Sequence, residues 1–125
     1  MLRTTIAILA LLSAHGCTDS ENARCIPLLP NWIAPSGQKI TEVAVKVELK
    51  KSQIVWNGMP IDEATLGNYL RSLSAKNIQP FLVFDPQTSD CRYGRRVRDL
   101  IDRNNPCQSG KCGQGHAEKF VDLVN

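Results

Sequence analysis

The sequence has no run of about 18 apolar residues, the length that a helix needs to cross a bilayer. Its net charge is only +3, without the dense basic stripe that is typical of a small nucleic-acid-binding protein. With 125 residues it has room for one domain at most. We therefore expect a single domain with no full transmembrane helix and no nucleic-acid partner.

Sequence signals of catalysis are also scarce. There is no C-x-x-C motif for thiol–disulfide chemistry, and no serine, cysteine or histidine constellation that would support hydrolysis. His116 lies in a glycine-rich stretch. Asp62, Asp85 and Asp90 are candidates for a catalytic pair of carboxylates. Asp62 is explained as a helix cap and Asp85 as the end of a strand, so Asp90 has no second carboxylate with which to form such a pair. We expect a protein that is not an enzyme and that has no cofactor and no metal.

The N-terminus has the order of a secretory signal. Arg3 supplies a positive charge, residues 6–12 are apolar, and Ala14-His15-Gly16 places small residues where a signal peptidase cuts. An uncut membrane anchor is the alternative, but residues 6–14 are too short to span a bilayer comfortably. We expect residues 1–16 to be a signal peptide and the mature chain to be periplasmic.

Cys17 follows the small residues directly, which resembles the lipobox of bacterial lipoproteins, although Ala14 stands where a leucine is usual. The chain has five cysteines, so a lipidated Cys17 leaves an even number for disulfides. We expect lipidation at Cys17 and attachment to a bacterial envelope membrane. Ordinary cleavage before Cys17 is the alternative.

The other four cysteines, Cys25, Cys91, Cys107 and Cys112, allow three disulfide connectivities. Cys107 and Cys112 enclose a short loop with a glycine, which favours pairing across that loop and leaves Cys25 to pair with Cys91. The competing hypothesis is a zinc site, because Cys107, Cys112 and His116 have the spacing C-x4-C-x3-H. Exported cysteines are normally oxidised, which favours the two disulfides.

Three segments precede the first expected helix. Residues 17–39 are rich in proline and have no periodicity, which predicts a lipid-anchored or extended arm, with Trp32 and Ile33 as a contact to the domain of residues 40–125. Residues 42–49 alternate between apolar and polar, which is typical of a half-buried strand. Residues 53–57 follow a polar turn and are expected to complete a hairpin.

Two helices and a central strand are then expected. Asp62 is a candidate N-cap for a helix whose apolar face is Leu66, Tyr69, Leu70 and Leu73. Residues 81–84 predict a strand that is buried on both faces, and residues 93–103 a second amphipathic helix. Residues 119–124 are ambiguous between strand and helix. The order β-β-α-β-α-(β) predicts an α+β, two-layer sandwich, a mixed sheet with both helices on one face.

Five motifs in this order resemble the periplasmic domain of the ExbD/TolR family of biopolymer transport proteins. They are the strand and hairpin, the Asn57-Gly58 turn, the capped helix after Asp62, the strand that ends in Asp85, and Tyr93-Gly94 at the second helix. The similarity covers about residues 40–103. In that family the domain follows a transmembrane helix with a proton-carrying aspartate, which residues 6–14 do not provide.

The resemblance implies a non-enzymatic, accessory or binding component of proton-motive-force-coupled envelope transport, without its own proton-carrying helix. Its partners would be a proton-channel protein and TonB-like or Tol-like envelope proteins, with peptidoglycan as a further candidate. The family also implies pairing through the C-terminus, so we expect a homodimer through the apolar tail that begins at Phe120. The alternative function is a disulfide-stapled lipoprotein that inhibits an enzyme such as a lysozyme, with the Cys107–Cys112 loop entering the cleft.

The second expected helix is rich in arginine, which suggests a basic patch for an acidic partner. The i,i+4 spacings predict that Arg95 pairs with Asp99, and Arg98 with Asp102. Arg92 and Arg96 lack such partners in the sequence and are therefore the partner-binding candidates. Trp56 shares the strand face of Ile54 and is expected in the core; on the surface it would be a binding anchor.

Overall fold

The computed structural model describes residues 25–35, 44–87, 90–104, 107 and 110–120. The strands are β1 (Trp32–Ile33), β2 (Ala44–Lys50), β3 (Gln53–Trp56), β4 (Met59–Ile61), β5 (Phe81–Asp85) and β6 (Cys112–Gln114). The helices are α2 (Glu63–Ala75), α3 (Cys91–Asn104) and the 3₁₀ turn η1 (Ala117–Lys119).

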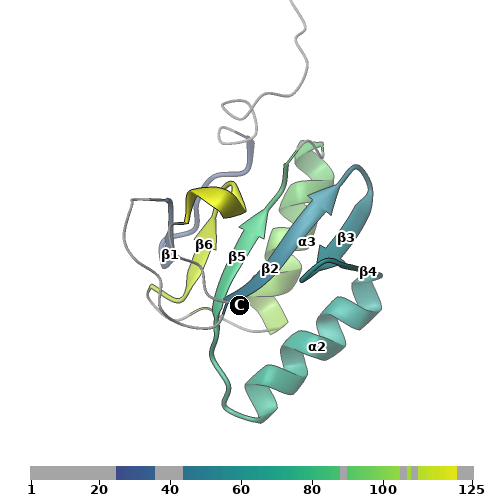
Figure 1. Ribbon diagram of the computed structural model, residues 1–125, viewed down its shortest axis with the longest axis vertical. Coiled ribbons are helices and arrows are strands. Elements are labelled where there is room, and N and C mark those ends of the chain that lie inside the picture. Colours follow the sequence, from purple (N-terminus) through teal and green to yellow (C-terminus); the bar gives the residue numbers. More distant parts are fainter. Residues whose placement is uncertain (1–24, 36–43, 88–89, 105–106, 108–109, 121–125) are drawn as a thin grey trace, which may run out of the picture.

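The strands form one mixed sheet in the order β1-β6-β5-β2-β3-β4 (Figure 1). β1, β6, β5 and β2 run parallel, and the antiparallel hairpins β2-β3 and β3-β4 complete the other side. The helices α2 and α3 pack against one face of the sheet, whereas η1 lies over the opposite face. The α+β sandwich with a mixed sheet and two helices on one face is therefore confirmed.

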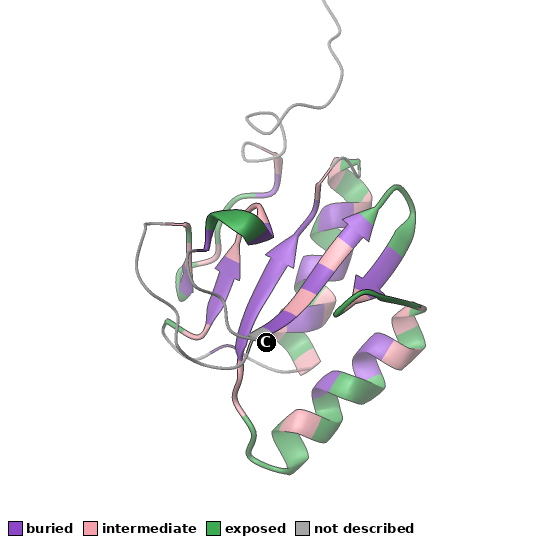
Figure 2. Cartoon of the chain, viewed as in Figure 1, coloured by how far each residue is buried: buried purple, intermediate pink, exposed green. Residues whose placement is uncertain are grey.

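The main core lies between the sheet and the two helices. Alternation along β2 and β5 sends both residues of every second register pair to the helical face, as with Val47 and Phe84. The residues of this core that are completely buried include Val47, Leu49, Leu66, Leu70, Leu82, Phe84, Val97 and Ile101. Figure 2 shows β5 buried along its whole length, as its unbroken apolar run predicts.

Local signals in the sequence set the start of both helices. The Asp62 carboxylate accepts a hydrogen bond from the Thr65 N–H at 2.8 Å, which makes Asp62 the N-cap of α2 as predicted. Asp90 accepts one from the Tyr93 N–H at 2.8 Å and begins α3 in the same way. The β3-β4 turn has positive φ at Asn57 (45°) and Gly58 (89°), and the Asn57 side chain accepts the Lys46 N–H.

Two parts of the fold differ from the expectation. The described part of the expected arm, residues 25–35, supplies strand β1 and the completely buried Ile26, so it belongs to the packed structure. Beside β5 lies β6, a strand that was not expected. Of the ambiguous segment 119–124, Lys119 ends η1 and Phe120 is not in a strand, whereas residues 121–124 lie outside the described residues. The three residues of β6 are too few to show an alternating pattern in the sequence.

The remaining expectations for the two ends of the chain concern residues that the structure does not describe. The signal peptide, Cys17 and the tail of residues 121–125 lie outside the described residues. None of the described helices combines the length and apolar character that crossing a membrane requires.

Candidate functional site

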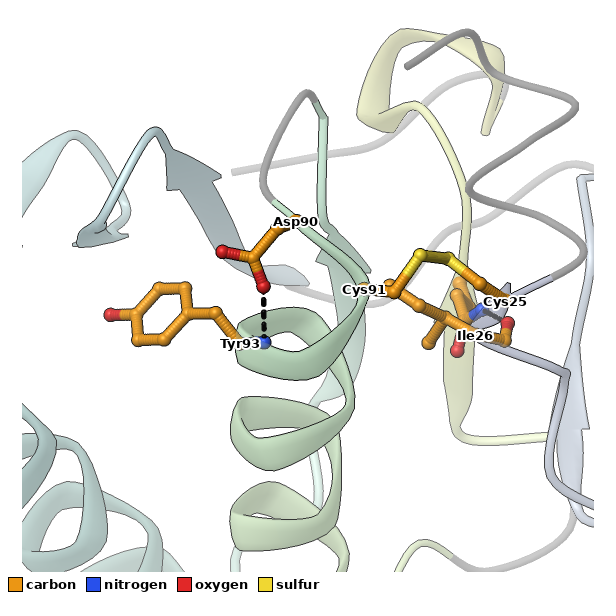
Figure 3. The surroundings of a disulfide bond; sticks show 6 residues. Cys25, Ile26, Asp90, Cys91 and Tyr93 are labelled. Carbon is orange, nitrogen blue, oxygen red and sulfur yellow. Dashed lines mark hydrogen bonds between the residues drawn. A yellow bond between two sulfur atoms is a disulfide. The ribbon is translucent and has the colours of Figure 1, made fainter. Parts of the chain in front are cut away.

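The four described cysteines form the two disulfides that their spacing favoured. Cys25 bonds to Cys91 and Cys107 to Cys112, each with a Cα–Cα distance of 5.6 Å. Because Cys107 and Cys112 are bonded to each other, they do not provide thiolates for the zinc site that was the competing hypothesis. The Cys25–Cys91 bond attaches the segment before β1 to the first residue of α3 (Figure 3).

The arginines of α3 bond to residues of the chain that the sequence did not suggest as partners. Arg96, predicted to lack a partner, donates two hydrogen bonds to the Glu63 carboxylate, at 3.0 and 2.7 Å. The two residues lie on different helices, so helical spacing could not reveal the pair. Arg92 is exposed, and among the described residues it forms no ion pair, so it remains the candidate of the two for an external partner.

Arg98 has a structural role that the i,i+4 spacing missed. Its guanidinium is buried, donates to the carbonyl of Pro27 and contacts Asp99 at 3.0 Å. Asp102, the expected partner, instead accepts a hydrogen bond from the Trp32 indole at 3.3 Å. These contacts hold residues 25–35 against α3, so Arg98 does not contribute to an accessible basic patch.

An apolar hollow of about 460 Å³ lies between the β3-β4 hairpin and α2. Trp56, Met59, Tyr69 and Leu73 line it, together with Asn57 and Ser72. The rings of Trp56 and Tyr69 meet edge to face with centroids 5.1 Å apart. Trp56 is half-buried: it packs on the core, as expected, and it also lines this hollow.

Exposure distinguishes this hollow from the core. Met59 is 59% exposed and Tyr69 is 39% exposed, although both are large and apolar over most of their surface. Aromatic residues and methionine are enriched at protein interfaces, and an aromatic ring in a hollow is a typical anchor. The hollow therefore has the composition that is typical of a protein-binding surface.

A second cluster of functional groups lies at the carboxyl end of β5. The Asp85 carboxylate is buried and accepts hydrogen bonds from the Gln87 and Ala117 N–H groups, both at 3.0 Å. Burial of the carboxylate raises the pKa of Asp85 above its usual value, and this effect outweighs the two hydrogen bonds, which lower the pKa. His116 Nδ1 lies 3.8 Å from Asp85 Oδ1, and Glu118 lies beside them. Asp85 and His116 lie far apart in the sequence, so no short motif could have revealed this cluster.

Comparison with known proteins adds no relative: no protein-family model, curated protein or solved structure matches this chain. The functional argument therefore depends on the residues and on their arrangement.

Proposed function

We propose that the chain is a non-enzymatic binding component of ExbD/TolR type. In this proposal it is exported, anchored by lipid at Cys17, and acts in proton-motive-force-coupled envelope transport without a proton-carrying transmembrane helix of its own. Its partners are a proton-channel protein and a TonB-like or Tol-like envelope protein.

The observation that carries this proposal is the order of the elements. A strand, an Asn57-Gly58 hairpin and a capped helix are followed by a strand that ends in Asp85 and by a helix with Tyr93-Gly94 in its first turn. These are the five features on which the resemblance depends. Their strands lie in one sheet, and both helices pack on one face of that sheet. A further strand, β4, follows the Asn57-Gly58 turn and precedes the Asp62 cap, and it lies at the edge of the sheet.

The apolar hollow supports a binding role over a catalytic one. It is built from large side chains that a partner can cover, and Asn57 and Ser72 are its polar residues. The described cysteines are all in disulfides, so none of them serves as a nucleophile. We therefore place the partner contact at Trp56, Met59 and Tyr69.

The test is a binding measurement with purified proteins. The proton-channel protein and the TonB-like or Tol-like protein of the same genome are immobilised in turn, and the full chain is passed over each. Met59→Glu places a charge in the hollow, and Ile78→Glu is the matched control, because Ile78 is also exposed and does not line the hollow. We expect the wild type and Ile78→Glu to bind one of these proteins and Met59→Glu to bind at least about tenfold more weakly, which corresponds to about 1.4 kcal/mol.

Two results would contradict the proposal. Equal binding by both variants would show that the hollow is not the contact surface. A wild-type chain that binds neither envelope protein but inhibits a lysozyme would support the alternative function, a lipoprotein inhibitor.

A further inference from the structure

The buried Asp85 carboxylate fixes the position of two other possible metal ligands. β5 ends at Asp85, and alternation along the strand puts its side chain on the same face as Phe81 and Val83, opposite the helices. The 3₁₀ turn η1 lies over that face (Figure 1). The Ala117 N–H donates to Asp85 Oδ2, which holds the start of η1 over the carboxylate. His116 and Glu118 are the residues on either side of Ala117, so the same hydrogen bond brings an imidazole and a second carboxylate to Asp85.

The ligand atoms of these three residues are close enough to bind one ion. A nitrogen of His116 and one carboxylate oxygen each from Asp85 and Glu118 all lie within 4.8 Å of one another. His116 Nδ1 and Asp85 Oδ1 are 3.8 Å apart, which is longer than a direct hydrogen bond. Zinc–ligand bonds of about 2.0–2.2 Å put ligand atoms roughly 3.2–3.6 Å apart in a tetrahedral site, so a small closing movement is sufficient.

The three residues differ in exposure in a way that suits a metal site. Asp85 is held by two backbone N–H groups, the kind of outer contact that orients a ligating carboxylate. The His116 side chain is half-buried and Glu118 is exposed, so an ion can reach both from solvent.

The charges near Asp85 favour a cation. Glu48 pairs in register with Asp85 on the neighbouring strand and accepts a hydrogen bond from the Gln87 side chain at 3.1 Å. Glu48, Asp85 and Glu118 thus bring three carboxylates to this end of the sheet. Within the described ranges, no lysine or arginine forms an ion pair with any of the three. A divalent cation would neutralise this excess of negative charge.

From this geometry we propose that Asp85, His116 and Glu118 bind one divalent transition-metal ion of the zinc class. Imidazole and carboxylate ligands suit zinc and its neighbours, and three protein ligands leave a fourth position for water or for a group of a partner. This site is separate from the zinc hypothesis based on Cys107 and Cys112, because it uses no sulfur.

The experiment titrates the full chain, with both disulfides formed and no histidine tag, with Zn²⁺ by calorimetry. His116→Gln and Glu118→Gln remove one ligand each. The matched control is Glu63→Gln, which removes a half-buried carboxylate on α2, on the opposite face of the sheet. We expect one equivalent of Zn²⁺ to bind the wild type and the control, and both ligand variants to bind at least about tenfold more weakly.

A second readout uses Co²⁺, whose visible absorption reports its coordination. The wild type is expected to give the spectrum of a low-coordinate Co²⁺ site, and His116→Gln is expected to lose it while its circular dichroism stays unchanged. The proposal is overturned if the wild type shows no saturable binding below millimolar Zn²⁺, or if His116→Gln binds as tightly as Glu63→Gln.

Discussion

The ring of Phe120 occupies the space in which a side chain at position 113 would lie. A Cβ atom on Gly113 would come within 2.6 Å of Phe120 Cε1 and Cζ, and within 3.2 Å of Phe81 Cζ. The rings of Phe81 and Phe120 have centroids 5.8 Å apart, and Val83 and Ala117 complete this smaller core. A glycine in β6 therefore lets Phe120 close the face of the sheet opposite the helices.

Gly113→Ala is expected to lower the free energy of unfolding by about 1–3 kcal/mol, because the added methyl group overpacks against Phe120. Where space permits, the same change is normally stabilising, by about 0.4–1 kcal/mol. Chemical denaturation measures the loss, and the double variant with Phe120→Leu tests its cause. If the penalty of Gly113→Ala is the same with and without Phe120→Leu, the contact with Phe120 is not responsible.

The two disulfides are expected to differ in their contribution to stability. The Cys25–Cys91 bond joins residues 66 apart in sequence and the Cys107–Cys112 bond residues 5 apart, so the first restricts the unfolded chain more. We expect the free energy of unfolding to fall by about 4 kcal/mol when Cys25 and Cys91 are both replaced by serine, and by about 2 kcal/mol when Cys107 and Cys112 are both replaced. Denaturation under non-reducing conditions makes the comparison. The reverse order of the two losses would contradict it.

The Asp62 cap predicts a pH dependence. The Thr65 N–H, and then the Thr65 side chain, donate hydrogen bonds that lower the pKa of Asp62 below 3.8, so ionised Asp62 stabilises the folded state above that pH. This stabilisation is lost as the pH falls through the lowered pKa. We expect the wild type to be more stable than Asp62→Asn at pH 6 and the difference to disappear toward pH 2. A difference that stays constant over this range would show that the charge of Asp62 has no effect.

Arg96 and Arg98 are expected to respond differently to replacement by alanine. The Arg96–Glu63 pair is exposed, so Arg96→Ala should cost less than about 1 kcal/mol. Arg98 is 5% exposed and donates to both Pro27 and Asp99, so Arg98→Ala should cost about 2–3 kcal/mol. Thermal unfolding of the two variants in parallel is the measurement, and equal costs would argue against a structural role for Arg98.

Patterns that lie within one element were predictable. The alternation of β2, the apolar run of β5 and the cap at Asp62 each depend on residues that are adjacent or a few positions apart. The pairing of the four described cysteines followed from loop length. These signals were sufficient for the fold class.

Contacts between distant segments were not predictable. The Arg96–Glu63 pair joins two helices, and Arg98 contacts a carbonyl before β1, so helical spacing within α3 could not indicate either. Asp85 and His116 meet because β6 pairs with β5 as far as Gln114 and because the Ala117 N–H bonds to Asp85 over the end of the sheet. The hollow beside Trp56 combines side chains of a hairpin and a helix, each of which alone has an ordinary amphipathic pattern.

Photo-crosslinking in living cells is the most direct test of the binding role. A photoreactive phenylalanine analogue replaces Met59 in the hollow or, as the control, the exposed Ile78. The proposal predicts that position 59 crosslinks to the proton-channel protein or to a TonB-like or Tol-like protein, and that position 78 does not. A crosslink from position 59 to a secreted hydrolase, or equal yields of the same product at both positions, would contradict it.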